Sequence, residues 1–184
     1  GIHFGRIAVN VGGPQVQRGK LVEEVEMVLS ETNLPASCLE LEVTETFVMQ
    51  RIDEIRDQLE ELRGIGITLA VDDFGTGYSS LRYLKELPIH KLKIDQSFVS
   101  DTPDDSDDAA IVETIVAMGR GLRLETIAEG VETEPQAAFL RQLGCRRAQG
   151  FLFSYPLSSA DFRERIGLTA RGRRRTRTPK SRNR

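Results

Sequence analysis

The sequence predicts an α/β fold, a TIM-like (β/α)8 barrel of which this chain holds about six of the eight βα units. Short runs rich in β-branched residues alternate with longer segments whose apolar residues recur at i, i+3, i+4 and i+7, the pattern of strands followed by one-sided helices. The polar residues that end the predicted strands recur about every 28 residues, close to the roughly 31 per unit of a 250-residue barrel.

The predicted elements follow one another in βα order. The strands are expected at residues 6–11, 38–45, 66–73, 90–95, 124–130 and 148–153, and the longer helices at residues 19–32, 51–66, 108–122 and 134–145. A closed barrel needs eight units, so we expect two further units before Gly1.

Charge is divided unevenly along the chain. The last fourteen residues, RGRRRTRTPKSRNR, hold eight of the 25 basic residues and no acid. We therefore expect a disordered basic tail at residues 169–184, after a barrel domain at residues 1–168. Without those eight charges, 17 basic and 28 acidic residues remain, a net charge of −11. Such an acidic body argues against specific nucleic-acid binding.

The remaining composition excludes other classes of protein. The two cysteines, Cys38 and Cys145, show no CxxC spacing and have no His nearby, so neither a disulfide framework nor a zinc site is indicated. No window approaches 18 consecutive apolar residues, so no membrane segment is predicted in this chain. We expect a cytoplasmic location, although an upstream region of the full-length protein could anchor it to a membrane.

Acidic residues end several predicted strands. The reacting groups of α/β barrels lie where strands end, and there the sequence places Asn10, Glu42, Asp72, Asp73 and Glu129. Clustered carboxylates repel one another unless a cation lies among them, and oxygen ligands without His or Cys favour Mg²⁺, Mn²⁺ or Ca²⁺. Adjacent Asp72 and Asp73 suit two ions about 4 Å apart, as in phosphodiester hydrolysis. The alternative for each carboxylate is a helix cap.

The run HKLKID alternates between polar and apolar residues. Its alternation predicts that Lys93 and Asp95 share one strand face, opposite Leu92 and Ile94. At the barrel mouth, Lys93 would neutralise a phosphate or orient the attacking water, and Asp95 would hold Lys93. The alternative is a surface salt bridge on an edge strand.

The stretch DDFGTGYSS follows the third strand. Its glycines permit positive φ angles, and its hydroxyl groups can bond the loop or cap the next helix. No GK[ST] follows, so it is not a Walker loop. We interpret it as a loop that positions the aspartates and closes over substrate.

Six motifs together resemble a known family. In order and spacing, NVGGPQV, LELEVTET, VDDFGTGYSSL, KLKIDQSFV, AEGVETEPQ and GCRRAQGFLFSYPL are similar to the EAL domain, a bacterial cyclic di-GMP phosphodiesterase family, over about residues 5–165. The resemblance implies a TIM-like barrel that uses two Mg²⁺ or Mn²⁺ ions to hydrolyse cyclic di-GMP to linear pGpG.

The resemblance also implies roles for individual residues. The metal ligands would be Asn10, Glu42, Asp72, Asp73 and Glu129. The catalytic residues would be Lys93, Glu129 and Asp95, with Lys93 contacting the hydrolytic water. Gln149 and Glu132 would lie in the substrate-binding part of the site, with Glu132 close to the second ion. Glu45 would anchor the DDFGTGYSS loop, which in this family also takes part in homodimer contacts.

Two departures from the family pattern bear on function. Gly12 stands where the family usually has Ser, which should alter loop stiffness more than chemistry. The strand carrying the Glu-Ala-Leu motif and the strand before it are expected upstream of Gly1. In such proteins the upstream domain is often a sensor or a GGDEF-type partner. Without that strand one ion lacks a carboxylate, and an inactive chain would be one consequence.

Two other functions are weighed against hydrolysis. The first is a non-catalytic cyclic di-GMP-binding or protein-interaction module, as in EAL-like domains that have lost ligands. The second is an enolase-like metal barrel, which needs a second strand lysine or a His base facing the metal. His3 and His90 precede strand ends, which argues against the second.

Overall fold

The computed structural model describes residues 5–77 and 81–166. The chain divides into two compact units, Gly1–Phe153 and Ser154–Arg184. The first unit holds the whole sheet. In the second unit, the N-cap of α9 (Ser159–Arg165) is Ser158, whose hydroxyl oxygen accepts a hydrogen bond from the Asp161 N–H. The predicted domain boundary at residue 168 and the basic tail lie outside the described residues.

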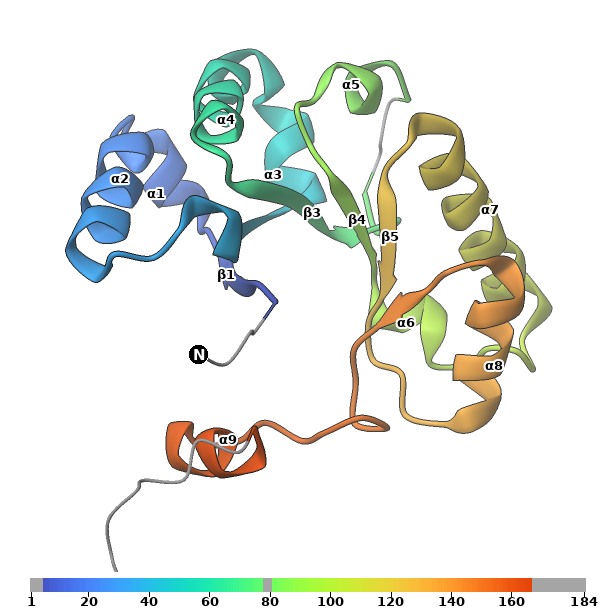
Figure 1. Ribbon diagram of the computed structural model, residues 1–184. Coiled ribbons are helices and arrows are strands. Elements are labelled where there is room, and N and C mark those ends of the chain that lie inside the picture. The colour runs from blue at the N-terminus through green and yellow to red at the C-terminus, as the bar shows by residue number, and fades with distance from the viewer. Residues whose placement is uncertain (1–4, 78–80, 167–184) are drawn as a thin grey trace, which may run out of the picture. The chain divides into compact units, whose positions relative to one another are not determined.

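Six parallel strands form one curled sheet in the order of the sequence (Figure 1). Every neighbour in the sheet is also the next strand along the chain, which is the strand order of a TIM-like barrel. Six of the eight βα units of such a barrel are therefore present. The strands are β1 (Ile7–Asn10), β2 (Leu39–Thr44), β3 (Thr68–Phe74), β4 (Lys91–Ile94), β5 (Glu125–Ala128) and β6 (Arg147–Ala148).

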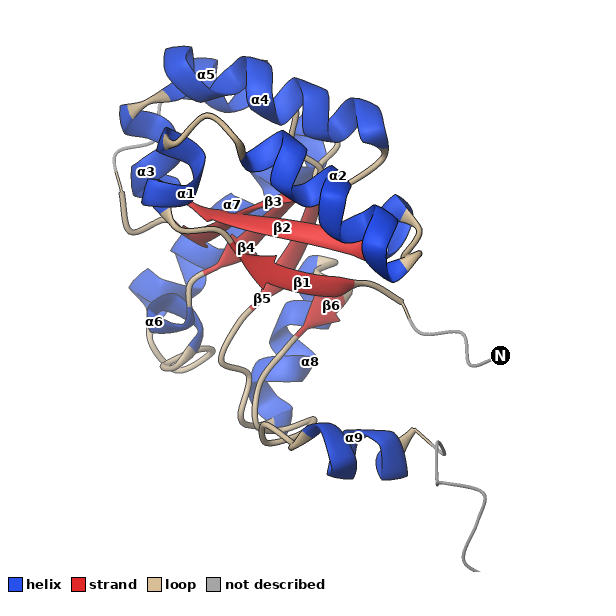
Figure 2. Cartoon of the chain, turned by 90° about the vertical axis from the view of Figure 1, so that its left-hand side faces the viewer, coloured by secondary structure: helices blue, strands red, loops and turns tan. Residues whose placement is uncertain are grey.

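The helices lie mainly on one side of the sheet (Figures 1 and 2). The four predicted long helices match α2 (Leu21–Thr32), α4 (Ile52–Ile65), α7 (Ser106–Leu122) and α8 (Glu134–Leu143) within two residues at each end. Shorter helices, which the periodicity does not predict, are α1 (Gly13–Gln17), α3 (Glu45–Gln50), α5 (Leu81–Glu86), α6 (Gln96–Val99) and the 3-10 turn η1 (Ala36–Cys38). One to two helical turns are too short to show a 3.6-residue period.

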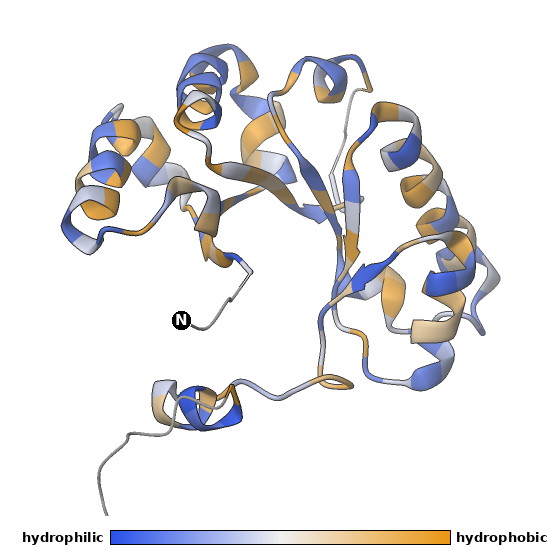
Figure 3. Ribbon diagram, viewed as in Figure 1, coloured by the Kyte–Doolittle hydropathy of each residue, from blue (hydrophilic) through white to orange (hydrophobic). Residues whose placement is uncertain are grey.

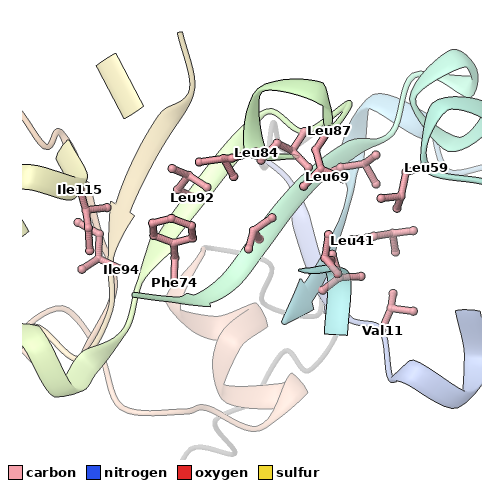
Figure 4. Packing of buried hydrophobic residues seen from close by; sticks show 14 of the residues in the cluster. Val11, Leu41, Leu59, Leu69, Phe74, Leu84, Leu87, Leu92, Ile94 and Ile115 are labelled. Carbon is pink, nitrogen blue, oxygen red and sulfur yellow. The ribbon is translucent and has the colours of Figure 1, made fainter. Parts of the chain in front are cut away.

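The sheet has one apolar and one charged face. The apolar side chains of the strands pack with those of the helices in a buried core that includes Leu41, Leu69 and Leu92 (Figure 4). Coloured by hydropathy, the ribbon shows hydrophobic and hydrophilic residues intermixed along the helices and strands (Figure 3). The alternate residues of β2 and β4, among them Glu42 and Lys93, point to the other face. The core thus leaves the inner face of the curled sheet free for polar chemistry.

The sixth strand is shorter than predicted. β6 ends at Ala148, whereas the sequence predicts strand over residues 148–153. Gly150 has a φ of 154°, and a Cβ there would clash with the Val131 carbonyl oxygen. The Leu152 N–H instead donates to that carbonyl at 3.0 Å, so the chain leaves the sheet and binds the loop after β5.

Among the described residues, we find no helix that combines the length and the apolar character needed to cross a bilayer.

His90, directly before β4, makes folding stability depend on pH. Its Nδ1 accepts a hydrogen bond from the Leu69 N–H at 3.1 Å, which suits a neutral imidazole. Burial, followed by the charges of Arg63 and Arg6, lowers the pKa of His90 from its ordinary value of 6.5. The unfolded chain therefore binds this proton more tightly than the folded chain. The stability contributed by neutral His90 is present above pH 6.5 and is lost as the pH falls through the lower folded-state pKa.

We expect this loss to disappear in His90→Asn, whose amide oxygen can accept the same N–H without titrating. The measurement is the free energy of unfolding in urea, for both proteins, between about pH 7.5 and about pH 5. The stability advantage of the wild type should shrink toward acid. An advantage that stays constant across this range would contradict the assignment.

Candidate active site

Lys93 is the centre of a charged cluster at the C-terminal ends of the strands. It lies in β4, and only 3% of its side chain is exposed. Its Nζ is 2.7 Å from Glu42 Oε2, 2.9 Å from Asp72 Oδ1 and 2.7 Å from Glu129 Oε1. The three partners come from β2, β3 and the residue after β5. Because β4 lies between β3 and β5, the alternative of a surface salt bridge on an edge strand is wrong.

These ion pairs set the protonation state of Lys93. Burial, the largest effect, would lower the pKa of the ammonium group. Hydrogen bonds to Glu129, Glu42 and Asp72 together outweigh burial and leave the pKa raised above its ordinary value. Lys93 is therefore a cation at neutral pH and cannot accept a proton there.

Asn10, the last residue of β1, faces the same carboxylates. Its amide oxygen is directed at acceptor atoms, and the reversed amide would let its nitrogen donate to Glu42 Oε2 and Asp72 Oδ2, each at 3.2 Å. An amide oxygen turned toward carboxylates is favourable only when a cation lies between them. Asn10 thus belongs to the cluster, and the better orientation of its amide depends on whether a cation is bound.

Asp72 and Asp73 both reach the cluster although they are adjacent in β3. Successive side chains of a regular strand point to opposite faces. Here the pairing of β3 with β4 shifts in register between Val71 and Phe74, and Asp73 has a positive φ of 53°. This bulge brings both carboxylates to one site, where oxygen atoms of Asp72, Asp73 and Glu129 lie within 4.8 Å of one another.

Glu129 directly follows β5 and joins the cluster to the end of β6. The Gln149 amide donates a hydrogen bond to Glu129 Oε1. Burial, the largest effect, acts with the charges of Asp72 and Glu42 to raise the pKa of Glu129 to about 7, although Lys93 acts in the opposite direction. The raised pKa of Glu129 therefore reflects burial first, with the neighbouring carboxylates acting in the same direction.

Asp95 differs from its predicted position. β4 ends at Ile94, and Asp95 is the N-cap of α6, where its Oδ1 accepts the Ser97 N–H at 2.9 Å. Asp95 therefore lies one residue beyond the end of β4, and its carboxylate lies near Asp73 of the cluster. The pKa of Asp73 is raised by burial first and then by the charges of Asp72 and Asp95. A catalytic role for Asp95 stays a prediction.

Helix capping does not explain Glu42 or Glu129. The N-cap of α3, after β2, is Thr44, and the N-cap of α8, after β5, is Thr133. Glu132 lies exposed just before Thr133, where its backbone N–H donates to Gln136 Oε1 at 2.8 Å. Glu132 is therefore close to Glu129 in the sequence, but the described contacts of its side chain do not include the cluster.

Glu45 contacts the loop that follows β3. It is the first residue of α3, is 1% exposed, and its Oε2 accepts the N–H groups of Gly75 at 2.8 Å and Gly77 at 3.2 Å. A Cβ at Gly77 would lie 3.2 Å from the Glu45 carboxyl carbon, so a glycine permits this close approach. The contact expected of a loop anchor is present, for the part of the loop that the structure describes.

The donor set fits a hard divalent cation. Across the described residues of the cluster, four carboxylates, from Glu42, Asp72, Asp73 and Glu129, surround one ammonium group. All the carboxylate ligand atoms are oxygens, and the Asn10 amide, which faces Glu42 and Asp72, can offer a further oxygen. Oxygen-only sites of this kind suit Mg²⁺, Mn²⁺ or Ca²⁺ better than Zn²⁺.

Sequence reasoning missed a second group of charges on the same face of the sheet. This group, which we call the charged layer, consists of Glu40, Lys91, Glu125 and Arg147. The signal was available in the period-2 patterns of LELEV and HKLKI, where Glu40 precedes Glu42 and Lys91 precedes Lys93 by two residues.

An α/β barrel sheet with an acidic, cation-fitting cluster at the strand ends defines a class of metal-binding barrel proteins. A family model described as "EAL domain" matches residues 2–156, and the chain belongs to the EAL domain family. The predicted family is confirmed.

Individual relatives agree with this family. The chain is 48% identical to "Cyclic di-GMP phosphodiesterase NbdA" of Pseudomonas aeruginosa over 159 residues, which are 86% of this chain and 20% of NbdA. It is 50% identical over 151 residues to the "Bifunctional diguanylate cyclase/cyclic di-GMP phosphodiesterase MucR" of the same species, covering 82% of this chain and 22% of MucR. The chain therefore spans about a fifth of the length of these curated relatives.

Solved structures confirm the TIM-like barrel fold. "PaMucR Phosphodiesterase, c-di-GMP complex" superposes with a TM-score of 0.83 at 48% identity, over 85% of this chain and 64% of that chain. A "manganese/cy-diGMP complex" of Klebsiella pneumoniae BlrP1 superposes with a TM-score of 0.76 at 36% identity, over 82% of this chain and 39% of that chain. The predicted fold class is thus correct.

The Glu45 contact predicts a specific loss of loop protection. In Glu45→Gln the neutral amide accepts the Gly75 and Gly77 N–H groups more weakly than the carboxylate. We expect amide hydrogen exchange at both glycines to become about tenfold faster, equal to about 1.4 kcal/mol. The matched control is Glu54→Gln, at an exposed glutamate that pairs with Arg51. Unchanged exchange in Glu45→Gln, or equal acceleration in the control, would refute the anchor.

Proposed function

We propose that this chain is part of a metal-dependent phosphodiesterase that hydrolyses cyclic di-GMP to linear pGpG. The observation that carries the proposal is the cluster of four carboxylates around Lys93 at the strand ends of a chain of the EAL family. The names of the relatives NbdA and MucR support the reaction and the substrate.

The proposed cofactor is a pair of Mg²⁺ or Mn²⁺ ions. Their ligands would be Asn10, Glu42, Asp72, Asp73 and Glu129. The geometry around Asp73 supports this, because the bulge in β3 gives the site a second carboxylate from one strand. Bound ions of this kind supply Lewis acidity toward a phosphoryl oxygen and make water a better nucleophile at neutral pH.

The proposed roles of the remaining residues follow from their contacts. Lys93, held as a cation, would stabilise the negative charge that develops on the phosphoryl group and orient the attacking water. Gln149 would fix the orientation of Glu129 through its hydrogen bond and lie against the substrate. Asp95, which lies near Asp73, would act beside Lys93 as a catalytic residue. Glu132 would lie close to the second ion in the substrate-binding part of the site. Glu45 would hold the DDFGTGYSS loop in place.

The proposal extends to the setting of the domain. A cytoplasmic location agrees with the two free cysteines. The bifunctional name of the MucR relative supports a sensor or GGDEF-type domain elsewhere in the full-length protein.

The test is an assay of the full-length protein with Mn²⁺ or Mg²⁺ and cyclic di-GMP, with pGpG measured by chromatography. Lys93→Met should lower kcat by about 100-fold or more, because it removes the cation that faces the developing charge. Chelation with EDTA should abolish turnover. Lys20→Met, at an exposed lysine that precedes α2, is the matched control and should leave kcat unchanged.

The outcomes separate the candidate functions. Formation of pGpG by wild type and its loss in Lys93→Met support hydrolysis. Binding of cyclic di-GMP without turnover, measured by calorimetry, would replace the proposal with a non-catalytic sensor. Equal turnover by wild type and Lys93→Met would refute the role of Lys93.

We further propose a homodimer through the region of the DDFGTGYSS loop. On α5, the helix after the loop, Leu81 is 62% exposed and Tyr83 is 39% exposed. We expect sedimentation equilibrium to give a dimer for wild type and a monomer for Leu81→Glu, because a buried charge at an interface is unfavourable. Ile111→Glu, at a 37% exposed residue of α7, should remain a dimer. A monomeric wild type would contradict this proposal.

A further inference from the structure

The charged layer lies one step along the strands from the active-site cluster. Lys91 Nζ is 2.5 Å from Glu40 Oε2 and 3.6 Å from Glu125 Oε2, and Arg147 pairs with the other oxygen of Glu125. Only 6% of the Lys91 side chain and 4% of the Glu40 side chain are exposed. One continuous set of ion pairs therefore links β2, β4, β5 and β6.

Each member of the charged layer precedes a site residue that lies in the same strand or directly after it. Glu40 precedes Glu42, Lys91 precedes Lys93 and Arg147 precedes Gln149 by two residues, and Glu125 precedes Glu129 by four. Two residues of a strand span about 6.6 Å. One cavity of about 530 Å³ is lined by members of both groups, including Glu40, Lys91, Glu42 and Gln149. A shift of a strand at the charged layer would therefore move the site residue carried by the same strand.

The strand between β2 and β4 makes room for the central ion pair. β3 separates Glu40 from Lys91, and the β3 residue in register with Lys91 is Ala70, which is fully buried. Its methyl side chain leaves space for the Lys91 ammonium to reach Glu40 across β3. A larger side chain at this position would have to displace the ion pair.

Stability alone does not account for a buried ion pair. Replacing such a pair by apolar residues of similar volume is often neutral or stabilising, and barrel interiors are usually filled by apolar side chains. What a buried ion pair adds is structural specificity, because it fixes which charged groups lie next to one another and at what distance. We propose that Glu40 and Lys91 are positioning residues, which align β2 and β4 so that Glu42 and Lys93 meet the other ligands at the cation site. This inference rests on the proposed metal-dependent function.

The test compares Mn²⁺ affinity with folding in the full-length protein. In the double variant Glu40→Gln/Lys91→Met both charges are removed while side-chain size is kept, so the chain should still unfold cooperatively in urea. We expect its Mn²⁺ affinity, measured by electron paramagnetic resonance, to be about tenfold weaker than that of wild type, as for other residues that orient metal ligands. Ala70→Val should weaken Mn²⁺ binding in the same way, and Lys91→Arg should retain most of it.

Leu59→Ala is the control for a purely structural effect. Leu59 is a 1% exposed core residue of α4, on the helix side of the sheet, so its truncation lowers stability while leaving the ion pairs of the charged layer in place. It should leave Mn²⁺ affinity unchanged under conditions where the chain is folded. Equal Mn²⁺ affinity in wild type and the double variant would overturn the positioning role while keeping the metal site. Absence of Mn²⁺ binding by wild type would overturn the proposed metal site, and the inference with it.

Discussion

The ion pairs of Lys93 are the interaction on which the arrangement of the site depends. Three carboxylates from different strands meet around one buried ammonium group, so each strand end is held by its attraction to the same charge. A buried charge is costly unless it is paired on several sides, and Lys93 is paired on three. The remaining carboxylate excess then makes the cluster receptive to further cations. The positions of these carboxylates and the charge balance of the proposed metal site thus depend on the same lysine.

The fold could be predicted from the sequence because its signals are local and repeated. Helices α4 and α7 each carry apolar residues at helical spacing for several turns, which fixed their ends within two residues. The acids at strand ends were predictable for a related reason. Parallel strands put their C-terminal ends at one edge, so Glu42, Asp72 and Glu129 had to approach one another once the strands were in order.

Other features of the fold and site could not be predicted, because they depend on turns and long-range contacts that the polar and apolar pattern of a strand does not show. The alternation of HKLKID continues through Asp95, yet the chain turns there because the carboxylate can cap α6. β6 ends early because Gly150 lets the backbone leave the sheet and bind the loop after β5. The pairing of Glu40 with Lys91 spans 51 positions and a strand between them, so only the three-dimensional order of β2, β3 and β4 reveals it.

The bulge at Asp73 makes the pairing of β3 with β4 less regular, but it brings a second carboxylate to the site. Regular pairing of β3 with β4 would be more uniform, but it would turn one of two adjacent carboxylates toward the helices. Deletion of one residue between Val71 and Phe74 would therefore make the pairing of β3 with β4 regular, but it would leave β3 with one carboxylate ligand in place of two. In an evolving family, such a shortened strand would give a well-folded protein with a weakened metal site.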